Sequence, residues 1–463
     1  MTKSPTKGAA QSPRPTLQQL RDAGVTKVEL ALTDVDGVLR GKYVSLDKFA
    51  SLFDGGGGFC DCVFGWDVAD QLYDNARYTG WHTGYPDAHY RLLADTQRTV
   101  PEANVPMFLG EFVAADGGDH PICPRTRLRN VLERAAAQSI QVKLAFEYEF
   151  FVFDETPHSI RAKGFRDLTP FTPGNFGYSV LRASTHETLF GGLMDYAAAL
   201  GVPLEAVHCE TGPGVWEAAI EVADALSAAD RANLFKTFTK VFFQKRELMA
   251  TFMAKWSMKY PGMGGHCHFS FWSPDGHGLF HDPAAPHRMS TTQRHALGGL
   301  QRYLPELIAL VAPTVNSYAR LVKGAWAPTA FTWGVENRTT AVRLIPGSAK
   351  SQRLECRVPG ADANPYLAAA AIVGAALLGV IERLEPAEPV AGNAYDVADR
   401  MTGPSRFPVD LREAAERLAK STAARTLFGA PFVEHFVATR QWEVREYTRS
   451  LNDWQLERYF EII

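Results

Sequence analysis

Four short segments of this chain carry acidic, imidazole and guanidinium side chains at spacings that could serve chemistry. The pairs are Glu147 with Glu149, Glu210 with Glu217, His266 with His268, and Glu355 with Arg357. Three of these pairs are two residues apart, and on a β-strand that spacing puts both side chains on one face. Neighbours such as Phe146, Phe150 and Phe269 favour strands. The sequence therefore predicts strands that present charged pairs to a common site.

The composition of this set predicts a site for divalent cations. Carboxylates that face the same way repel one another unless cations lie between them. Four Glu with one or two His, and no Cys partner, suit Mg²⁺ or Mn²⁺ better than structural Zn²⁺. The arginines that follow along the chain supply forked donors that fit phosphate and carboxylate groups.

The overall composition excludes several classes of protein. The chain has 463 residues, so we expect more than one domain, and its formal net charge of −3 argues against general nucleic-acid binding. Residues 1–15 lack an apolar stretch, which predicts a disordered tail rather than a signal peptide. The apolar run over residues 366–381 is shorter than the ~20 residues needed to span a bilayer, so we expect a buried helix, no membrane contact and a cytoplasmic protein.

The order of predicted elements divides the chain in two. A strand over 25–34, a turn at Asp36-Gly37 and a strand over 38–44 begin a small mixed domain, residues 16–118. Residues 119–463 alternate the charged strands with helices. The helices are expected over 125–138, 185–200, 228–252, 293–310 and 365–384.

Taken together, these segments resemble the glutamine synthetase superfamily over roughly residues 16–463. No single motif is specific, but the order and spacing of the whole set are. The landmarks are the hairpin over 34–41, Glu147-x-Glu149, Glu210-x₆-Glu217, His266-x-His268, Asn316-Ser-Tyr-Ala-Arg320, Glu336-Asn-Arg338, Glu355-x-Arg357 and Asn364-Pro-Tyr-Leu.

The resemblance implies an α+β fold, with an N-terminal β-grasp domain and a C-terminal catalytic domain built from a curved antiparallel sheet and surrounding helices. It implies a homododecamer of two hexameric rings with active sites at subunit interfaces. It also implies ATP as a substrate and two or more Mg²⁺ (or Mn²⁺) ions in each active site.

The resemblance also assigns roles to individual residues. The implied metal ligands are Glu147, Glu149, Glu210, Glu217, His266 and Glu355. The implied glutamate-binding residues are Gly262, Arg320 and Arg357. The implied ATP-binding residues are His268, Ser270, Arg338, Arg343, Lys350 and Arg353. Among these, Arg320 and Arg338 are also expected to act in catalysis.

The chain departs from the pattern of glutamine synthetases proper at three places. A flap glutamate that helps to bind ammonium and takes its proton is replaced by Trp326, in Lys-Gly-Ala-Trp-Ala-Pro. The loop before His266 reads Pro261-Gly-Met-Gly-Gly, and Val215 stands where a Gln is usual. A Trp side chain cannot accept a proton, but it can stack on a ring or attract a cation.

These departures predict a ligase that joins glutamate to an amine bulkier than ammonia, with Trp326 in a catalytic role. An alkylammonium must lose a proton before it attacks, and the predicted acceptor is Asp67 or Asp70 from a neighbouring subunit, with Glu336 as a weaker candidate. Tyr395 is expected to be structural.

Three alternatives remain open at this point. The protein could be a glutamine synthetase that uses ammonia. It could be a non-catalytic structural relative, although such a relative should have lost metal ligands. It could also act on an acid other than glutamate, an idea motivated by Pro261 and Met263.

Overall fold

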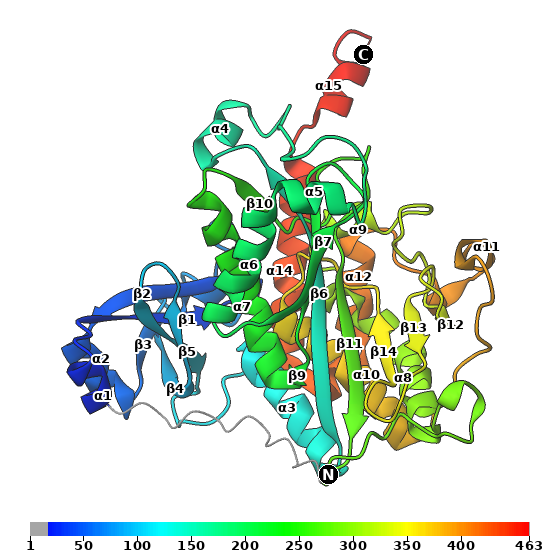
Figure 1. Ribbon diagram of the computed structural model, residues 1–463, viewed down its shortest axis with the longest axis horizontal. Helices are drawn as coiled ribbons and strands as arrows, with labels where there is room; N and C mark the ends of the chain where they lie inside the picture. Colours follow the sequence, from blue (N-terminus) through cyan, green and yellow to red (C-terminus); the bar gives the residue numbers. More distant parts are fainter. Residues whose placement is uncertain (1–16, 463) are drawn as a thin grey trace.

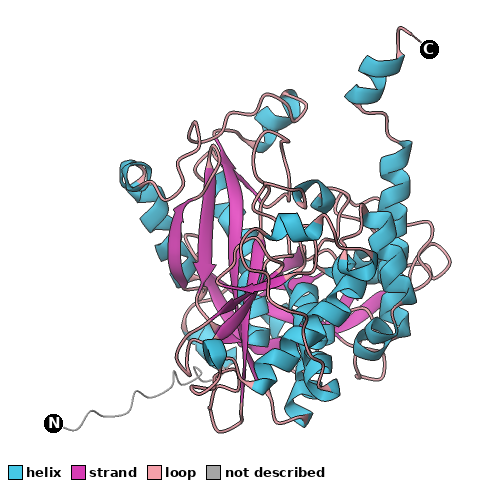
Figure 2. Ribbon diagram, turned by 90° about the vertical axis from the view of Figure 1, so that its right-hand side faces the viewer, coloured by secondary structure: helices cyan, strands magenta, loops and turns pink. Residues whose placement is uncertain are grey.

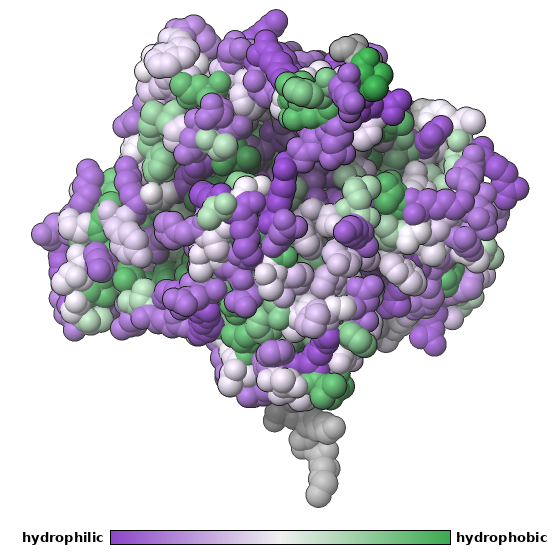
Figure 3. All heavy atoms as spheres, turned by 90° about the horizontal axis from the view of Figure 1, so that it is seen from above, coloured by the Kyte–Doolittle hydropathy of each residue, from purple (hydrophilic) through white to green (hydrophobic). Residues whose placement is uncertain are grey.

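The computed structural model describes residues 17–462, and the tail predicted over residues 1–15 lies outside them. The chain forms a smaller five-stranded sheet near its N-terminus and a larger nine-stranded sheet (Figure 1). Helices surround the strands of the larger sheet (Figure 2). Seen from above, the surface is hollowed near its centre, and the wall of the hollow is mostly hydrophilic (Figure 3).

The smaller sheet has the strand order β2-β1-β5-β4-β3. Its strands are β1 (Lys27–Thr33), β2 (Leu39–Ser45), β3 (Gly57–Cys60), β4 (Asp87–Val100) and β5 (Val105–Phe112). Neighbouring strands are antiparallel except β1 and β5, which run parallel. The helix α2 (Leu46–Phe53) packs Phe49 against Phe108 of β5, with 4.8 Å between the ring centroids.

The larger sheet has the order β12-β13-β14-β11-β6-β8-β7, and two short strands, β9 and β10, also pair with β6. Its strands are β6 (Gln141–Phe153), β7 (Leu204–Cys209), β8 (Val215–Ile220), β9 (Ala223–Asp224), β10 (Met249–Thr251), β11 (Gly265–Trp272), β12 (Trp333–Val335), β13 (Val342–Ile345) and β14 (Arg353–Cys356). All the pairings are antiparallel except β12 with β13.

The longest helices pack against this sheet and against one another. The α-helices other than α2 are α1 (Leu17–Asp22), α3 (Pro124–Ala137), α4 (Pro157–Ala162), α5 (Val180–Thr185), α6 (Glu187–Ala199), α7 (Ala225–Gln244), α8 (Thr291–Leu307), α9 (Ser317–Arg320), α10 (Pro365–Glu382), α11 (Ala394–Ala398), α12 (Leu411–Lys420), α13 (Thr422–Phe428), α14 (Ala430–Arg449) and α15 (Asp453–Tyr459). Short 3₁₀ helices cover Asp61–Phe64, Pro286–Arg288, Ile308–Leu310 and Gly403–Ser405.

The apolar run near residue 370 is the core helix α10, as expected. Among the described residues it is the one helix long and apolar enough to cross a membrane, but 78% of it is buried inside the protein. It packs against α8, α3 and α7. Asn364 caps its first turn, where its side-chain oxygen accepts a hydrogen bond from the Tyr366 amide at 3.0 Å.

Most predicted elements are confirmed within a few residues of their expected ends. The prediction of one helix over 228–252 is wrong, because α7 ends at Gln244 and the chain then forms strand β10. Glu247 has a φ of 58°, a left-handed conformation that no α-helix continues through. Ala250 beyond it pairs with Val152 of β6. The predicted α+β fold with a curved sheet is confirmed.

Candidate active site

Adjacent strands of the larger sheet hold the charged residues in direct cross-strand pairs. Glu147 of β6 lies opposite His266 of β11. Glu149, two residues further along β6, lies opposite Glu217 of β8. The period-two alternation of a strand puts Glu147 and Glu149 on the same face, as the spacing predicted.

The pairing continues outward on both sides of the sheet. Glu355 of β14 lies opposite both His268 of β11 and Arg343 of β13. At the other edge, His208 of β7 lies opposite Glu217. Side chains directly opposite in antiparallel strands are about 5 Å apart at Cβ, so each pair can interact.

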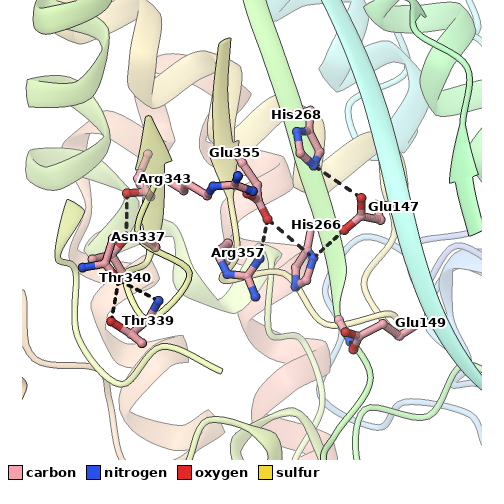
Figure 4. A network of polar contacts seen from close by, with 12 residues as sticks. Glu147, Glu149, His266, His268, Asn337, Thr339, Thr340, Arg343, Glu355 and Arg357 are labelled. Carbon is pink, nitrogen blue, oxygen red and sulfur yellow. Dashed lines mark hydrogen bonds and ion pairs between the residues drawn. The ribbon is translucent and has the colours of Figure 1, made fainter. Parts of the chain in front are cut away.

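One group of side chains gathers around Glu147 (Figure 4). Its carboxylate lies 3.2 Å from Nδ1 of His266 and 3.8 Å from Nε2 of His268. Nδ1 of His266 lies 3.7 Å from the carboxylate of Glu355. Arg357 and Arg343 both donate to Glu355, the latter at 3.1 Å.

Burial and these neighbours set the protonation of the first group. Burial, with the Arg357 guanidinium nearby, lowers the pKa of His266 to about 4, so the ring is neutral near pH 7. Burial alone would raise the pKa of Glu355, but Arg357 and the nearby histidines hold it well below its usual value. A neutral imidazole beside ionised carboxylates is the form that can bind a metal ion.

A second group gathers around Glu217. Its carboxylate lies 2.9 Å from Nε2 of His208, and Nδ1 of His208 lies 3.9 Å from Glu210. Burial and the charge of Glu217 raise the pKa of Glu149 to about 7. The Glu149 carboxylate also accepts a hydrogen bond from the Gly264 amide at 2.5 Å. Burial raises the pKa of Glu217 as well.

His208 is a site residue that the sequence analysis missed. It stands two residues before Glu210, the same spacing that marked the other pairs. Burial opposes its protonation, but the hydrogen bond to Glu217 raises the pKa of His208 to about 9. The ring of Tyr178 stacks on it, with 4.4 Å between centroids.

The residues present fit a divalent cation site. Three sets of side chains bring potential ligand atoms within 4.8 Å of one another: Glu147, His268 and Glu355; Glu147, Glu217 and His266; and His208, Glu210 and Glu217. Nε2 of His268 is buried and has no hydrogen-bond partner among the described residues, although it faces Glu147. A buried unpaired polar atom is costly, and a cation or its water shell would satisfy it.

Four of the six residues predicted to bind ATP line a cavity of about 620 Å³ beside the first group, and Arg338 and Arg343 do not line it. The cavity reaches from Glu147 past Trp272, and its lining includes the predicted His268, Ser270, Lys350 and Arg353. Its size is typical of small-molecule sites. Nε of Arg353 donates to Nδ1 of His268 at 3.2 Å, and the Trp272 indole donates to Ser270 at 2.8 Å.

The two arginines predicted to contact phosphate differ in their surroundings. Arg343 bridges Glu355 and Glu336, so its guanidinium is already positioned. Arg338 is exposed and forms no hydrogen bond or ion pair with any residue that the structure describes. A guanidinium free of carboxylate partners is available to an anion that enters the site.

A second, narrow cavity adjoins Glu149 and Glu210 and includes Gly262, Arg320 and Trp326 in its lining. Arg320 is 3% exposed and donates to the carbonyls of residues 357 and 358. A Cβ at Gly262 would lie 2.5 Å from the Ala254 carbonyl, so this position has room for no side chain. The Trp326 side chain is 60% exposed at this cavity.

Of the predicted proton acceptors, Asp67 and Asp70 lie away from the charged pairs, whereas Glu336 lies beside them through Arg343. Asp67 accepts from the amides of residues 69 and 71, both at 2.8 Å, and so orders its own loop. Asp70 pairs with Arg40 at 2.8 Å. Glu336 pairs with Arg343. Within one chain, therefore, Asp67 does not meet the charged pairs, and its assignment depends on a neighbouring subunit.

Tyr395 is buried and holds the segment that carries Trp326. Its hydroxyl donates to the Ala327 carbonyl at 3.0 Å. Lys323, earlier in the same segment, pairs with Asp399 at 2.6 Å. The expected structural role of Tyr395 agrees with these contacts.

The two sheets, and the three sets of side chains that could hold a metal ion, are those of one class of enzyme. A profile of the glutamine synthetase catalytic domain matches residues 121–459. The chain belongs to the glutamine synthetase family and is a ligase of that family.

Several known proteins are similar along nearly the whole chain. Type-1 glutamine synthetase 2 of Dictyostelium discoideum is 44% identical over 96% of this chain and 86% of its own length. Glutamate–isopropylamine ligase of a Pseudomonas species is 35% identical, over 95% and 96%. Gamma-glutamylethanolamide synthetase GlnA4 of Streptomyces coelicolor is 34% identical, over 94% and 93%. The solved complex of GmaS with ADP has a TM-score of 0.84 at 27% identity, covering 97% of this chain and 100% of GmaS.

Proposed function

We propose that this protein joins the γ-carboxylate of glutamate to an organic amine with consumption of ATP. The observation that carries the proposal is Trp326, which lines the cavity of Arg320 and Glu149 where the family pattern has a glutamate. An indole face accommodates a cationic or aromatic amine but cannot take a proton from ammonium. Two similar proteins are named for isopropylamine and for an ethanolamide.

The proposed reaction has two steps. The γ-phosphoryl group of ATP passes to the γ-carboxylate of glutamate, which gives an acyl phosphate and ADP. The amine nitrogen then attacks the acyl carbon, the carbon–oxygen bond to phosphate breaks, and the nitrogen gives up a proton as the amide forms. Amide formation from a carboxylate needs this activation, because a free carboxylate oxygen is a poor leaving group.

Different residues of the charged face, which is formed by the two groups around Glu147 and Glu217 and the arginines beside them, would act in these two steps. Arg320 and Arg357 would hold the carboxylates of glutamate, and Arg338 and Arg343 would stabilise the charge that develops on the transferred phosphoryl group. Divalent cations at Glu147, Glu149, Glu210, Glu217, His266 and Glu355 would neutralise the phosphate oxygens, and Mg²⁺ or Mn²⁺ fits this ligand set. His208, which lies 2.9 Å from Glu217 and 3.9 Å from Glu210, would hold these two carboxylates in place.

The assembly and the proton acceptor belong to the same proposal. In a homododecamer of two hexameric rings, the loop that carries Asp67 would reach the active site of a neighbour. The hydrogen bonds of Asp67 within its loop fix its position through Oδ1, and its other carboxylate oxygen, Oδ2, has no hydrogen-bond partner among the described residues. We place the enzyme in the cytoplasm, where ATP and glutamate are available.

The experiment is a measurement of ADP release with Mg²⁺, ATP and glutamate across a panel of ammonia, methylamine, ethanolamine, isopropylamine, putrescine and aniline. Strong turnover with an organic amine and weak turnover with ammonia supports the proposal and names the amine class. Preference for ammonia contradicts it. If no amine of the panel gives turnover with glutamate, the panel is repeated with other carboxylates, and turnover with one of them contradicts the assignment of glutamate as the acid substrate.

The second candidate is a glutamine synthetase that uses ammonia. It is favoured by the name of the Dictyostelium relative, which is 44% identical. The same panel decides between the two, because they differ in the ratio of ammonia to amine turnover and not in their need for ATP.

A further inference from the structure

Two cysteines lie close together in the smaller sheet, which holds none of the candidate metal ligands. Cys60 is the last residue of β3, and Cys62 lies inside the 3₁₀ helix that follows it. Both are partly exposed, whereas the other four cysteines of the chain are buried. The proposed reaction uses neither thiol, so their proximity has no role in the chemistry described above.

The backbone brings the two thiols within reach of a disulfide bond. Consecutive Cα atoms are about 3.8 Å apart, so residues separated by one other lie at most about 7 Å apart at Cα. A disulfide spans Cα atoms that are about 4.4–6.8 Å apart. The Cys62 thiol also donates a hydrogen bond to Cys60, which places both side chains on the same side of the turn. The pair can therefore be joined without a rearrangement of the fold.

The two cysteines differ in how readily they ionise. Burial and the hydrogen bond to Cys60 raise the pKa of Cys62 to about 12, and the charge of Asp61 acts in the same direction. Cys62 therefore stays protonated near pH 7. Because a thiolate and not a thiol attacks an oxidant, the first attack by this pair belongs to Cys60.

Positive charge lies near both thiols. The charge of Arg40 acts on Cys62 and favours its thiolate. Lys42 lies over the ring of Phe59, the residue before Cys60, with 4.9 Å between its ammonium and the ring centroid. Partly exposed cysteines beside cationic groups are the ones that react with oxidants, whereas buried cysteines in apolar surroundings are inert.

We propose that Cys60 and Cys62 form a redox-sensitive pair, which a small disulfide such as oxidised glutathione converts to an intramolecular disulfide bond. Such bonds in cytoplasmic proteins are usually transient and sense the redox state of the cell. The Cys60 thiolate, whose proton has gone to water, attacks one sulfur of the small disulfide. The S–S bond of the small disulfide breaks, one thiolate leaves, and Cys60 carries the other half as a mixed disulfide.

The second step closes the bond within the protein. The thiolate that left takes the proton of Cys62, and the Cys62 sulfur attacks the sulfur of Cys60. The second half of the small disulfide then leaves as a thiolate and takes a proton from water. Two electrons pass from the cysteines to the small disulfide, which ends as two thiols.

The bond would act on the loop that carries Asp67. The Cys62 carbonyl accepts a hydrogen bond from the Gly65 amide at 2.8 Å, two residues before Asp67. The Asp61 amide donates to the carbonyl of residue 86 at 2.9 Å, which holds the chain beside Cys60 in place. A covalent bond is shorter than a contact between thiols, so its formation draws Cys62 toward Cys60 and away from Gly65. The effect on turnover rests on the proposed role of Asp67, whereas the covalent step does not.

The first test incubates the full-length protein with mixtures of reduced and oxidised glutathione, alkylates the free thiols and maps the cysteines by mass spectrometry. The variants are Cys60→Ser and Cys62→Ser. Cys123→Ser is the matched control, because it removes a buried cysteine just before α3. All four proteins are compared by melting temperature before oxidation.

We expect the parent protein and Cys123→Ser to form the disulfide between residues 60 and 62. Cys62→Ser should stop at a mixed disulfide of Cys60 with glutathione, and Cys60→Ser should stay reduced. Alkylation of both cysteines in the parent protein after incubation with oxidised glutathione alone overturns the proposal. A glutathione adduct that forms as fast in Cys60→Ser as in Cys62→Ser overturns the order of attack.

The second test measures ADP release with the preferred amine before and after oxidation. We expect kcat to fall roughly tenfold or more, because a displacement of about 1 Å in a positioned group is enough for such a loss. Dithiothreitol should restore kcat, and Cys60→Ser should keep its turnover in oxidised glutathione. The KM for ATP should stay level, since the cavity with the predicted ATP-binding residues is lined by the larger sheet.

The two tests fail in distinguishable ways. A disulfide that forms without loss of turnover overturns the effect on the loop of Asp67. A protein that turns over no amine before oxidation contradicts the proposed function, and mass spectrometry then still decides whether Cys60 and Cys62 are a redox-sensitive pair.

Discussion

Glu147 and His266 are direct cross-strand partners, and their side chains meet at 3.2 Å. The neighbouring pairs Glu149 with Glu217 and Glu355 with Arg343 follow the same rule on adjacent strands. The site is thus a property of strand register rather than of loops. Rigid strands hold charged groups more accurately than loops do, which suits a reaction that depends on positioning.

Replacement of Trp326 tests the amine specificity. Trp326→Ala should raise the KM for the preferred amine by roughly fivefold, because loss of an aromatic contact is worth about 1 kcal/mol. Trp326→Glu should raise ammonia turnover relative to amine turnover, because a carboxylate can accept a proton from ammonium. Both ratios are measured by ADP release.

The control for Trp326 is Trp454→Ala in α15, a tryptophan with the same exposed fraction of 60%. It should leave the ratio of amine to ammonia turnover unchanged. A Trp326→Glu variant that keeps the parent ratio would show that the indole does not select the amine.

Glu149→Gln should separate cation binding from folding. The amide oxygen can still accept from Gly264, but the charge is lost, so we expect Mg²⁺ affinity to fall roughly tenfold or more. The melting temperature without metal should stay level or rise, because the raised pKa of Glu149 shows that its buried charge is unfavourable.

The measurement for Glu149→Gln is the melting temperature across a Mg²⁺ titration, since a ligand of the folded state raises it. Glu221→Gln, an exposed position after β8, is the control. A Glu149→Gln protein whose melting temperature still rises with Mg²⁺ as the parent's does would remove Glu149 from the ligand set.

Tyr395→Phe should loosen the segment that carries Trp326. The variant loses the hydrogen bond to the Ala327 carbonyl, worth about 1 kcal/mol, which corresponds to about fivefold in kcat/KM for the amine. We expect little change in the KM for ATP. Steady-state kinetics that show equal losses for both substrates would point to general destabilisation, and Tyr447→Phe on the exposed face of α14 is the control.

Two buried histidines should make the protein sensitive to acid. Burial, with positive charge nearby, lowers the pKa of His120 to about 3 and that of His435 to about 4. Below pH ~6.5 these histidines become protonated in the unfolded chain but stay neutral in the folded chain. The free energy of unfolding therefore falls as the pH falls from about 6.5 toward 4. Each histidine contributes at most about 1.4 kcal/mol per pH unit in this window.

The melting temperature of His435→Phe should therefore fall less than that of the parent protein between pH 7 and pH 5. Both proteins are measured at roughly constant ionic strength. The buried ring of His435 packs against Tyr78, with 6.0 Å between ring centroids, and a phenyl ring keeps that aromatic contact. His277→Phe, at an exposed position, should follow the parent. Identical slopes for His435→Phe and the parent would contradict this account.

Much of this fold and site could be predicted from the sequence. Alternation along residues 144–152 predicted both strand β6 and the shared face of Glu147 and Glu149, because a strand repeats every two residues. The approach of His208 to Glu217 could not be predicted in the same way. An irregularity between Leu204 and Ala206 shifts the register of β7 against β8, and register between strands is set by partners distant in the sequence.

The end of α7 and the surroundings of Asp67 could not be predicted either, because both depend on contacts that the local sequence does not determine. The sequence after Gln244 remains compatible with helix, and only the pairing of β10 with β6 decides otherwise. The place of Asp67 depends on hydrogen bonds within its own loop and on contacts between subunits. Local sequence patterns carry little information about either.

The cross-strand arrangement also constrains how this gene can change over evolutionary time. A substitution at Glu355 alters one candidate metal ligand. A single inserted or deleted residue within β14 turns every later side chain of that strand to the opposite face of the sheet. Strands β6, β8, β11 and β14, which carry these charged residues, should therefore accept point replacements on the opposite face of the sheet and should not vary in length. Homologues should vary in length between strands and keep a constant residue count from Glu147 to Glu149, His266 to His268 and Glu355 to Arg357.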